Sequence, residues 1–527
     1  MKLPKRLNAE QAGFTLPAVL SVILAASITG TAILTVIFNN FFVVGNTIKS
    51  QQAFNIAEAG VNYYLWHLSH NPTDYKDGQN TPAPQADPVL GFGPYVHNYV
   101  DDNAKVTGTY TLWIKPAGNG STVVDIRSIG KVNGTNMTRT IQAQIGAASF
   151  ASYSLAADTA LWFGNTESAN GPVHSNVGIR MDGSSSGDVT SANATYVPPG
   201  SLGGDGNTHP GVWCSSSVTS PVNCNTRPKN DWRYPVTAVD FNQVNTSLCA
   251  IKKAAFAGTP THAALAAQSN ACSATPGART ETYLPRRATS FNIARGYLVQ
   301  LNTNNTYDLY NVNGENDRLT PYTSALTLQL VESGIPVDDS GVIFAEDNVW
   351  VRTNPTYHGR VTVAAGRLAS DTQAANIVVA DDILYSTKNG QDAIGLIAED
   401  SVIVAPYAPP ASGAFTFEID AASLAQSGSV TYPSVYRTDT NRCSRGWVNS
   451  NQSFVYYGSV ASRQTWTWTW QRGNSCVDAV QSGSNYYSGI LNNSTQYDYN
   501  LLYAPPPSYP ITGGYNILSW REVLTQP

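Results

Sequence analysis

Charged residues are scarce in this sequence, at 13% of the chain, and 31 basic residues nearly cancel 36 acidic ones. A protein dedicated to nucleic acid needs a basic stripe that neutralises phosphates, and a net charge of −5 does not favour one. We therefore predict no nucleic-acid partner. Asn, Ser, Thr, Gln and Tyr are left to build the polar surface, a composition typical of secreted, β-rich proteins. The 527 residues are too many for one compact core and predict two or three domains.

The sequence also lacks the motifs of several enzyme classes. It contains neither the HExxH motif of zinc proteases nor a phosphate-binding P-loop. Its seven histidines are scattered without the spacing of a metal site or a catalytic triad. The segment GSSSG at 183–187 matches the GxSxG pattern around Ser185, but it lies in a Ser/Gly-rich turn rather than on a strand-to-helix elbow. We expect no catalytic residue, no metal, no cofactor and hence no enzyme.

Cysteine is limited to six residues, none of them in a CxxC pair. A zinc ribbon or a thioredoxin-type site is therefore not expected. An even number of widely spaced cysteines suits structural disulfides in an oxidising compartment. Many connectivities remain open, and we favour pairing between neighbours along the chain. The predicted disulfides are Cys214–Cys224, Cys249–Cys272 and Cys443–Cys476.

The longest apolar run of the chain lies near its N-terminus. Lys2, Lys5 and Arg6 precede an uncharged stretch that extends from Gln11 to Ile48. A helix needs ~20 apolar residues to cross ~30 Å of hydrocarbon, and this stretch is longer than the apolar region of a signal peptide. The basic leader predicts a cytoplasmic N-terminus and a single membrane pass with the rest of the chain outside.

Pro17 stands close to the start of this apolar run. A proline inside a helix removes a hydrogen bond and clashes with the preceding turn, which costs ~3 kcal/mol or more. If the chain is cut between Gly13 and Phe14, Pro17 falls in the first turn, where no N–H group has an intrahelical partner. The proline therefore predicts a helix that begins at Phe14. An uncleaved signal anchor is the alternative.

The stretch from Gly13 through Phe14, Thr15 and Leu16, after a basic leader and before a long apolar helix, resembles the type III signal of type IV pilins and type II secretion pseudopilins. The resemblance implies that a prepilin peptidase cuts after Gly13 and methylates Phe14. One residue departs from the pattern, because the family usually carries Glu as the fifth mature residue and this chain has Ala18. That carboxylate is thought to pair with a neighbouring subunit, since an unpaired one is expensive in hydrocarbon. Ala18 therefore fits a minor or tip subunit.

The helix is expected to continue through residues 46–68, so that it covers 14–69 after a leader of 1–13. The segment AEAG at 57–60, with aromatic residues after it, resembles PilX-type minor pilins. Three segments within 107–146 alternate apolar and polar residues and predict an antiparallel meander. A long helix followed by such a sheet is also the pilin layout, and we assign residues 70–148 to a small antiparallel β-domain.

A different periodicity begins after residue 150. The segments IFAEDNVWV at 343–351 and LIAEDSVIV at 396–404 match at five positions, and Ala364 and Ala380 lie between them as further equivalents. The matched pairs are Ala345/Ala398, Glu346/Glu399, Asp347/Asp400, Val349/Val402 and Val351/Val404. A repeat this short cannot bury its own apolar face, so its copies must stack. We predict a right-handed parallel β-helix over 149–440.

The rest of the outer chain is assigned relative to this solenoid. Residues 171–183 and 186–197 are expected to form shorter rungs of it. Residues 200–290 hold four of the six cysteines and are expected to form a disulfide-stapled insertion. The aromatic, proline-rich segment 441–527 is expected to cap an end of the solenoid. The predicted fold is therefore mainly β, with one long N-terminal helix.

Two groups of residues are candidate ligand sites. Acidic pairs that recur along the solenoid could bind Ca²⁺ through their oxygens, or they are turn residues repeated with the coil, which we favour. These pairs are Asp338–Asp339, Glu346–Asp347, Asp381–Asp382 and Glu399–Asp400. Trp466, Trp468 and Trp470 fall on one face of a strand by its two-residue period. They could stack on sugar rings or a partner surface, or pack over another sheet, which is the more common arrangement.

Taken together, these features favour a membrane-inserted minor pilin or pseudopilin-like subunit for type IV pilus assembly, placed at the tip, with adhesion by the outer domain. Its partners would be the prepilin peptidase, other pilin subunits, the cytoplasmic membrane and surface glycans, and it would lie at the pilus or cell surface. The alternatives are a surface-anchored β-helix enzyme acting on polysaccharide, a glycan-binding protein, or a tethered surface protein without a filament.

The resemblance generates a first prediction: the mature chain starts at Phe14 and carries an N-methyl group. Mass spectrometry of the N-terminal peptide, taken from assembled material, checks both the cut and the modification. An intact leader in that material would contradict the pilin interpretation.

Overall fold

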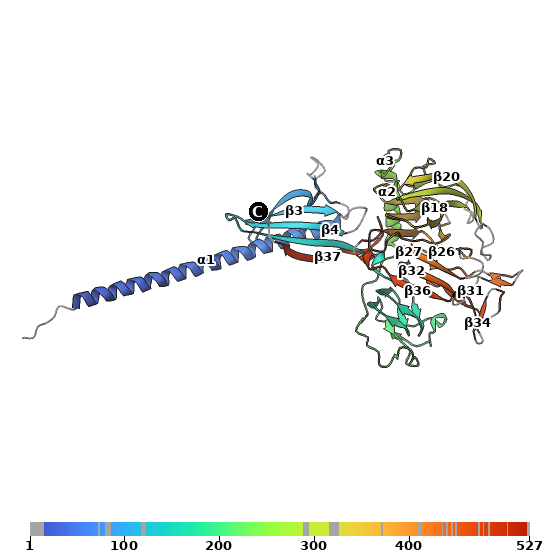
Figure 1. The fold of residues 1–527 in the computed structure, drawn as a ribbon, viewed down its shortest axis with the longest axis horizontal. Helices are drawn as coiled ribbons and strands as arrows, with labels where there is room; N and C mark the ends of the chain where they lie inside the picture. Colours follow the sequence, from blue (N-terminus) through green and yellow to red (C-terminus); the bar gives the residue numbers. More distant parts are fainter. Residues whose placement is uncertain are drawn as a thin grey trace, which may run out of the picture. The chain divides into compact units, whose positions relative to one another are not determined.

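The computed structural model describes most of the chain from residue 15 to residue 523. It divides into unit 1 (Met1–Lys115, Ile126–Ala143 and Ser519–Pro527) and unit 2 (Pro116–Asp125 and Gln144–Leu518), whose elements are labelled in Figure 1. The described residues are 15–71, 74–78, 86–116, 123–287, 295–315, 326–369, 373–408, 414–434, 436–438, 441–443, 446–447, 451–472, 475–477, 479–482, 485–502 and 504–523.

Unit 1 is organised around helix α1 (Thr15–His70). Its apolar first part contains several Ser and Thr residues, whose hydroxyls donate to carbonyls one turn earlier, as Ser21 Oγ does to Pro17 O at 2.7 Å. These bonds let hydroxyl groups sit in an apolar helix without an unpaired donor. The buried residues of the later part recur at helical spacing, at Ala53, Ile56, Ala57, Val61, Tyr64 and Leu68. The predicted long helix is confirmed.

A six-stranded sheet packs on the later part of α1. Its order is β1 (Ala86–Asp87), β2 (Gly91–Val100), β3 (Val106–Pro116), β4 (Val123–Val132), β5 (Thr138–Ser149) and β37 (Ile511–Val523). Strands β2 and β3 pair antiparallel. Glycine permits close approach, because a Cβ on Gly60 of α1 would lie 2.3 Å from Ser128 Oγ, and one on Gly130 of β4 would lie 2.1 Å from Ala53 O. The AEAG segment thus brings the helix onto the sheet.

The C-terminal strand corrects the prediction that residues 441–527 form a cap. Strand β37 is the edge of the unit 1 sheet, beside β5. In unit 1, Arg139 pairs with Glu522, Arg521 Nη2 donates to Gln142 Oε1 at 3.1 Å, and the Trp520 ring centroid lies 6.0 Å from that of Phe54. The chain therefore leaves the sheet at β5, builds unit 2, and returns to the neighbouring position in the same sheet.

Unit 2 contains two ladders of parallel strands. In the first ladder every neighbouring pair along the following order is parallel. Its order is β16 (Trp232–Arg233), β12 (Val189–Ser191), β9 (Val173–Ser175), β6 (Leu155–Ala157), β32 (Gln452–Ser462), β27 (Phe415–Ala425), β25 (Ala393–Ala398), β23 (Arg360–Ala365), β21 (Val342–Ala345) and β17 (Tyr283–Leu284). Strand β36 (Asn493–Tyr497) also pairs with β32.

The second ladder is built from strands between residues 296 and 431 of unit 2. Its parallel strands are β18 (Gly296–Asn302), β22 (Asn348–Asn354), β24 (Ile377–Val379), β26 (Val402–Val404) and β28 (Val430–Thr431), extended antiparallel by β19 (Thr306–Glu315) and β20 (Leu326–Pro336). Five smaller sheets complete the described part of unit 2. Three of them lie in the first half: β7 (Leu161–Phe163) with β10 (Ile179–Met181) and β15 (Val212–Trp213), β8 (Ser168–Ala169) with β11 (Ser184–Ser185), and β13 (Thr195–Tyr196) with β14 (His209–Pro210). The other two are β29 (Tyr436–Arg437) with β30 (Arg442–Cys443), and β31 (Gly446–Trp447) with β35 (Asn485–Ile490), β33 (Thr469–Arg472) and β34 (Val480–Ser482). Strands that are buried on both sides suit parallel pairing.

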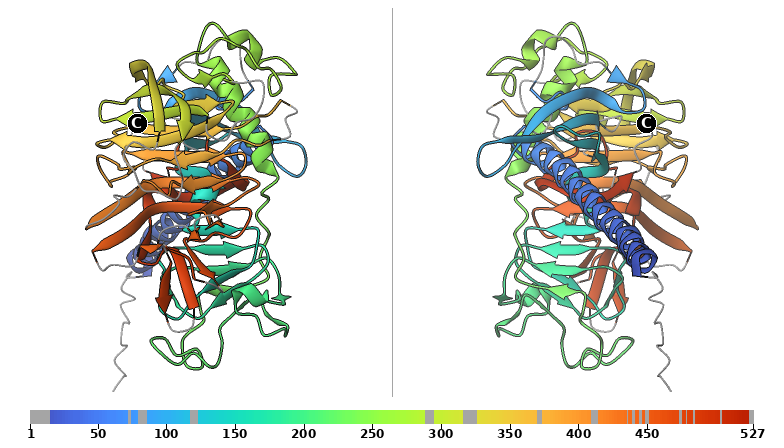
Figure 2. Two further views of the ribbon diagram at one scale, coloured as in Figure 1. Left: turned by 90° about the vertical axis from the view of Figure 1, so that its right-hand side faces the viewer. Right: turned by 90° about the vertical axis from the view of Figure 1, so that its left-hand side faces the viewer.

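The order of strands in the first ladder shows that unit 2 is built in two halves. The chain enters at β6, moves outward through β9 and β12 to β16, and then crosses to the opposite end at β17. From β17 it returns strand by strand to β32, which pairs with β6. Figure 2 shows the teal strands of the first half stacked next to the orange and yellow strands of the second. In the predicted rungs over 171–183 and 186–197, strands β9 to β12 pair in parallel, but as a separate half, and β13 pairs antiparallel with β14.

The ladder register tests the sequence repeat. Ala345 and Ala398 occupy one column, while Val349 and Val402 occupy another, two coils apart. This part of the alignment is confirmed. Two of its equivalents are wrong: the residue in the alanine column is Ala365, not Ala364, and Ala380 follows β24 in the second ladder. Loops of unequal length separate the strands, so a nearly constant period misplaces intermediate residues. The right-handed winding of a β-helix stays a prediction.

A column of small side chains runs through the first ladder. Its members are aligned by the register and none has exposed surface: Ala345, Ala365, Ala398, Ala425, Ser462, Ala157, Ser175 and Ser191. The column crosses the junction between β32 and β6. Both halves therefore share one interior packing pattern, in which a small residue stands at the same position of the strands from β21 to β12, and the column ends at β17 with Leu284.

The insertion predicted for 200–290 is shorter than expected, because β16 and β17 within it belong to the first ladder and β15 pairs in parallel with β10. Between β16 and β17 lie α2 (Gln243–Ala257) and α3 (Ala263–Ala266). Val244, Leu248, Ile251 and Ala255 form the buried face of α2 and belong to one apolar cluster with residues of β21, β23 and β25. All three predicted disulfides are present, Cys214–Cys224, Cys249–Cys272 and Cys443–Cys476.

The small-residue column generates a second prediction. Ala398→Leu should lower the free energy of unfolding by ~1–3 kcal/mol, because added methylene groups in a packed interior force strain. Thermal unfolding followed by circular dichroism checks this, with Ala264→Leu on the exposed surface of α3 as the matched control. The control should stay within ~0.5 kcal/mol of the wild type. Equal stability of the two variants would contradict the packing role of the column.

Candidate functional site

The first half of α1 is an exposed apolar surface. An 18-residue window in it has a mean hydropathy of 2.2, and none of that window is buried. Leu16 is 72% exposed and Ile48 is still 54% exposed. By length and composition, α1 is the one helix among the described residues that could cross a membrane. So much exposed apolar surface needs cover from lipid or from other protein.

The residues assigned to the helix start lie at the beginning of this surface. Gly13 and Phe14 fall outside the described residues. Thr15 is the first described residue of α1, and Leu16, Pro17 and Ala18 follow in its first turn, all three exposed. Pro17 thus stands where a proline is tolerated, and its carbonyl accepts the Ser21 hydroxyl. Cleavage and methylation stay predictions.

The other end of α1 carries a polar cluster that sequence reasoning missed. His67 Nε2 lies 3.1 Å from Asp74 Oδ2, and His97 Nε2 lies 2.7 Å from Asp77 Oδ2. Tyr63 donates to Asp77 Oδ1 at 2.9 Å. These contacts tie residues 74–78 and strand β2 to the end of the helix. The histidines lie seven and 20 residues from their aspartates in sequence, and no known motif has this spacing.

The acidic pairs considered for Ca²⁺ are held by protein groups. Glu346 pairs with Lys252, and Asp347 Oδ1 accepts from Arg367 Nη2 at 2.6 Å. Glu399 Oε2 accepts from the Arg367 backbone N–H at 2.6 Å. Burial raises the pKa of Glu346 and lowers that of Lys252. Across the described part of the chain, no three His, Cys, Asp or Glu side chains are grouped as a metal site. Glu346 and Asp347 are buried ion-pair partners rather than exposed turn residues.

The three tryptophans do not form an exposed row. Trp468 is 3% exposed and packs edge-on to Phe454, with ring centroids 5.0 Å apart. Trp470 is partly buried, and its Nε1 donates to Tyr432 O at 2.8 Å. Residues 466–468 precede strand β33 instead of lying within one strand. The interpretation as interior packing therefore holds for Trp468, while Trp466 lines a cavity.

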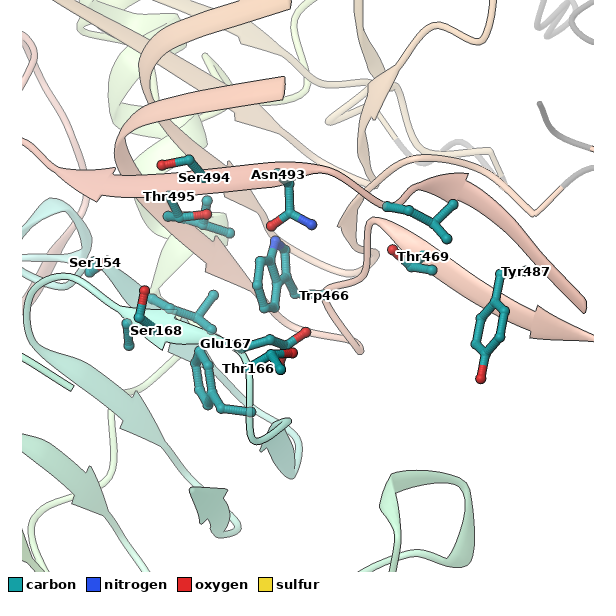
Figure 3. Close-up of a pocket in the computed structure, with 15 residues that line it drawn as sticks. Ser154, Thr166, Glu167, Ser168, Trp466, Thr469, Tyr487, Asn493, Ser494 and Thr495 are labelled. Atoms are coloured by element: carbon teal, nitrogen blue, oxygen red, sulfur yellow. The ribbon is translucent and has the colours of Figure 1, made fainter. Parts of the chain in front are cut away.

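That cavity, of about 500 Å³, lies in unit 2 beside the junction of the two halves. One edge of β32 pairs with β36 up to Gly458↔Tyr497 and then with β6 from Val460↔Leu155 onward. Leu155 of β6 and Asn493 of β36 both line the cavity. Figure 3 shows the lining residues, which come from the 163–169 segment, from β36, and from around β33 and β35.

The lining combines aromatic and uncharged polar side chains. It includes Trp466, Tyr487, Thr166, Asn493 and Ser494, together with one carboxylate, Glu167. Glu167 Oε2 accepts the Gly164 N–H at 2.6 Å. Glu167 has exposed surface, yet the protein around it desolvates the carboxyl and raises its pKa. Sequence reasoning found Trp466 but not the other members, because they converge only where the halves meet.

Comparison with known proteins does not show a family for this chain. No family model and no curated protein matches this chain. Among solved structures, the competence-associated pilin ComZ from Thermus thermophilus is 12% identical, over 91% of this chain and 98% of that one, with a TM-score of 0.30. A likeness this distant carries no argument about function.

A third prediction concerns the acidic pair Asp381–Asp382. Burial raises the pKa of Asp382 to about 6, so its folded-state carboxyl binds a proton more tightly than the unfolded chain does. Its contribution to stability is therefore largest at low pH and is lost as the pH rises from ~4 to ~6. Asp382→Asn should gain ~1–3 kcal/mol over the wild type at pH 7 and nothing at pH 4.

Denaturant unfolding at the two pH values checks this effect. The amide oxygen introduced by Asp382→Asn can still accept the Glu418 N–H, which lies 2.8 Å from Asp382 Oδ1. Asp381→Asn, at the exposed neighbour, is the matched control. A gain at pH 7 that is equally large at pH 4 would show that the carboxyl is not the cause.

Proposed function

We propose that this chain is a membrane-inserted, pilin-like minor subunit of a type IV pilus or a pseudopilus, with unit 2 outside the cell. The observation that supports this most is that the two halves of α1 differ in exposure. Its first half exposes apolar side chains from Leu16 to Ile48, while its second half forms the core of unit 1. One continuous helix is both the anchor and the core of a small β-domain.

This arrangement suits a subunit that moves from a bilayer into a filament. A helix packed against its own sheet through Ala53, Val61, Tyr64 and Leu68 carries unit 1 rigidly when its apolar half changes surroundings. In lipid the apolar half is covered by acyl chains, and in a filament it is covered by the corresponding halves of other subunits. Neither state requires unit 1 to unfold.

The start of α1 supports the finer parts of the proposal. Cleavage by a prepilin peptidase after Gly13 would place Pro17 in the first turn of the mature helix, where it removes no hydrogen bond. Ala18 then occupies the position where pilins usually carry a glutamate. A subunit without that carboxylate has no pairing partner to satisfy, which suits the tip.

Unit 2 is the surface domain of this proposal. Unit 2 is inserted in the sequence between β5 and β37, so the chain connects it with unit 1 at two points instead of one. We propose that its parallel ladders wind as a right-handed β-helix and that it serves adhesion. The proposal assigns no catalytic step to the chain.

The fourth prediction tests the tip assignment. Ala18→Glu should not increase filament incorporation, because a tip subunit offers its Glu no partner and an unpaired carboxylate costs ~2.5–3.5 kcal/mol in the membrane on insertion scales. Immunoblots of sheared filaments measure incorporation, and Ala18→Leu is the matched apolar control, which should behave as the wild type.

A clear gain by the Glu variant would indicate an ordinary shaft position. Absence of the wild-type chain from sheared filaments, in cells that make them, would contradict the pilin-like function itself.

A further inference from the structure

The cavity at the fork of β32 has the chemistry of a saccharide site. Sugar rings present an apolar C–H face together with a rim of hydroxyls, so their sites combine aromatic faces with uncharged donors and acceptors. Trp466 and Tyr487 supply aromatic rings, and Thr166 and Asn493 supply neutral polar groups. A volume of about 500 Å³ also falls within the usual range of small-molecule sites.

We propose that this cavity binds a neutral oligosaccharide, with Trp466 as the stacking platform. The ring is held in advance, because its centroid lies 6.3 Å from that of Phe163 and 5.8 Å from that of Trp468. A platform fixed by such neighbours loses little side-chain freedom when a ligand arrives. In Figure 3 the indole stands between β36 and the 163–169 segment, with Asn493 beside it.

The polar groups around the platform are uncommitted. Within the described part of the chain, the side chains of Thr166, Tyr487, Asn493 and Ser494 make no hydrogen bond to protein. The Thr469 hydroxyl, by contrast, donates to Ile490 O. Free groups can bond ligand hydroxyls without breaking an internal bond first. The free groups of Thr166, Tyr487 and Asn493 lie on different sides of the cavity and favour a ligand with many hydroxyls.

The charge of the lining narrows the ligand class. Its described members include no Lys, Arg or His, and its single charged residue is Glu167. Phosphate-bearing chains and acidic sugars would therefore meet a carboxylate without a cation to offset it. A purely apolar ligand would leave the hydroxyl and amide groups unpaired. A neutral sugar chain avoids both penalties.

This inference deepens the adhesion assigned to unit 2 in the proposed function, but it rests on residues of unit 2 alone. Loss of sugar binding with normal filament incorporation would overturn the saccharide site only. Sugar binding by a chain that never enters a filament would overturn only the pilin-like role. The two failures are therefore distinguishable.

The fifth prediction is tested on the full chain, purified in detergent micelles, by isothermal titration calorimetry. The probes are cellotetraose, maltotetraose and triacetylchitotriose, with trigalacturonate as the acidic comparator. At least one neutral probe should bind, and trigalacturonate should bind at least tenfold more weakly. Trp466→Ala should weaken the bound probe at least tenfold, and Tyr487→Phe or Asn493→Ala about threefold or more.

Tyr499→Phe is the matched control, since Tyr499 is 57% exposed and lies outside the cavity. It should leave the affinity unchanged. Because Trp466→Ala removes packing against Phe163, the thermal unfolding midpoint of this variant is measured first. If the variant is misfolded, the affinities of Tyr487→Phe and Asn493→Ala decide the test. Failure of all three neutral probes to bind, preference for trigalacturonate, or unchanged affinity in the folded cavity variants would overturn the inference.

Discussion

The apolar side chains on the exposed half of α1 must be shielded from water, and no other described part of unit 1 covers them. From Leu16 to Ile48 large apolar side chains face outward, while the second half of the same helix is already packed against the unit 1 sheet. Exposed apolar area is unfavourable by roughly 25 cal/mol per Å², so these residues need lipid or other helices around them. Lipid would meet that requirement in a membrane, and the filament that we propose would meet it with the helices of other subunits.

Unit 2 depends on a second constraint, the meeting of its two halves. Strand β32 must pair with β6 on one stretch and with β36 on another, and the column of small residues must continue from Ser462 to Ala157. A junction made by main-chain pairing leaves little freedom in how the halves align. The cavity lined by Trp466 lies beside this junction, with Leu155 of β6 and Asn493 of β36 both in its lining.

The features that depend on neighbouring residues could be predicted from the sequence, whereas those that depend on pairing between distant strands could not. The apolar helix, the meander after it, the cysteine pairs and the register of Ala345 with Ala398 could be inferred, because each depends on nearby residues or on a repeated pattern. The return of β37 to the first sheet and the reversal of order at β17 could not, since nothing in β37 specifies β5 as its neighbour and nothing in β17 specifies that the strand order reverses there. The convergence of Trp466 with the 163–169 segment could not be predicted for the same reason.

The central claim, that other subunits cover the apolar half of α1 in a filament, is tested most directly by crosslinking in cells. A photoreactive amino acid at position 36, where Val36 is 59% exposed on the apolar half, reports what covers it, and one at position 96, where Val96 is 63% exposed on β2, is the control. The account predicts adducts between position 36 and other single-helix subunits in sheared filaments, and none from position 96. Adducts with lipid alone, and no protein partner in any fraction, would contradict it.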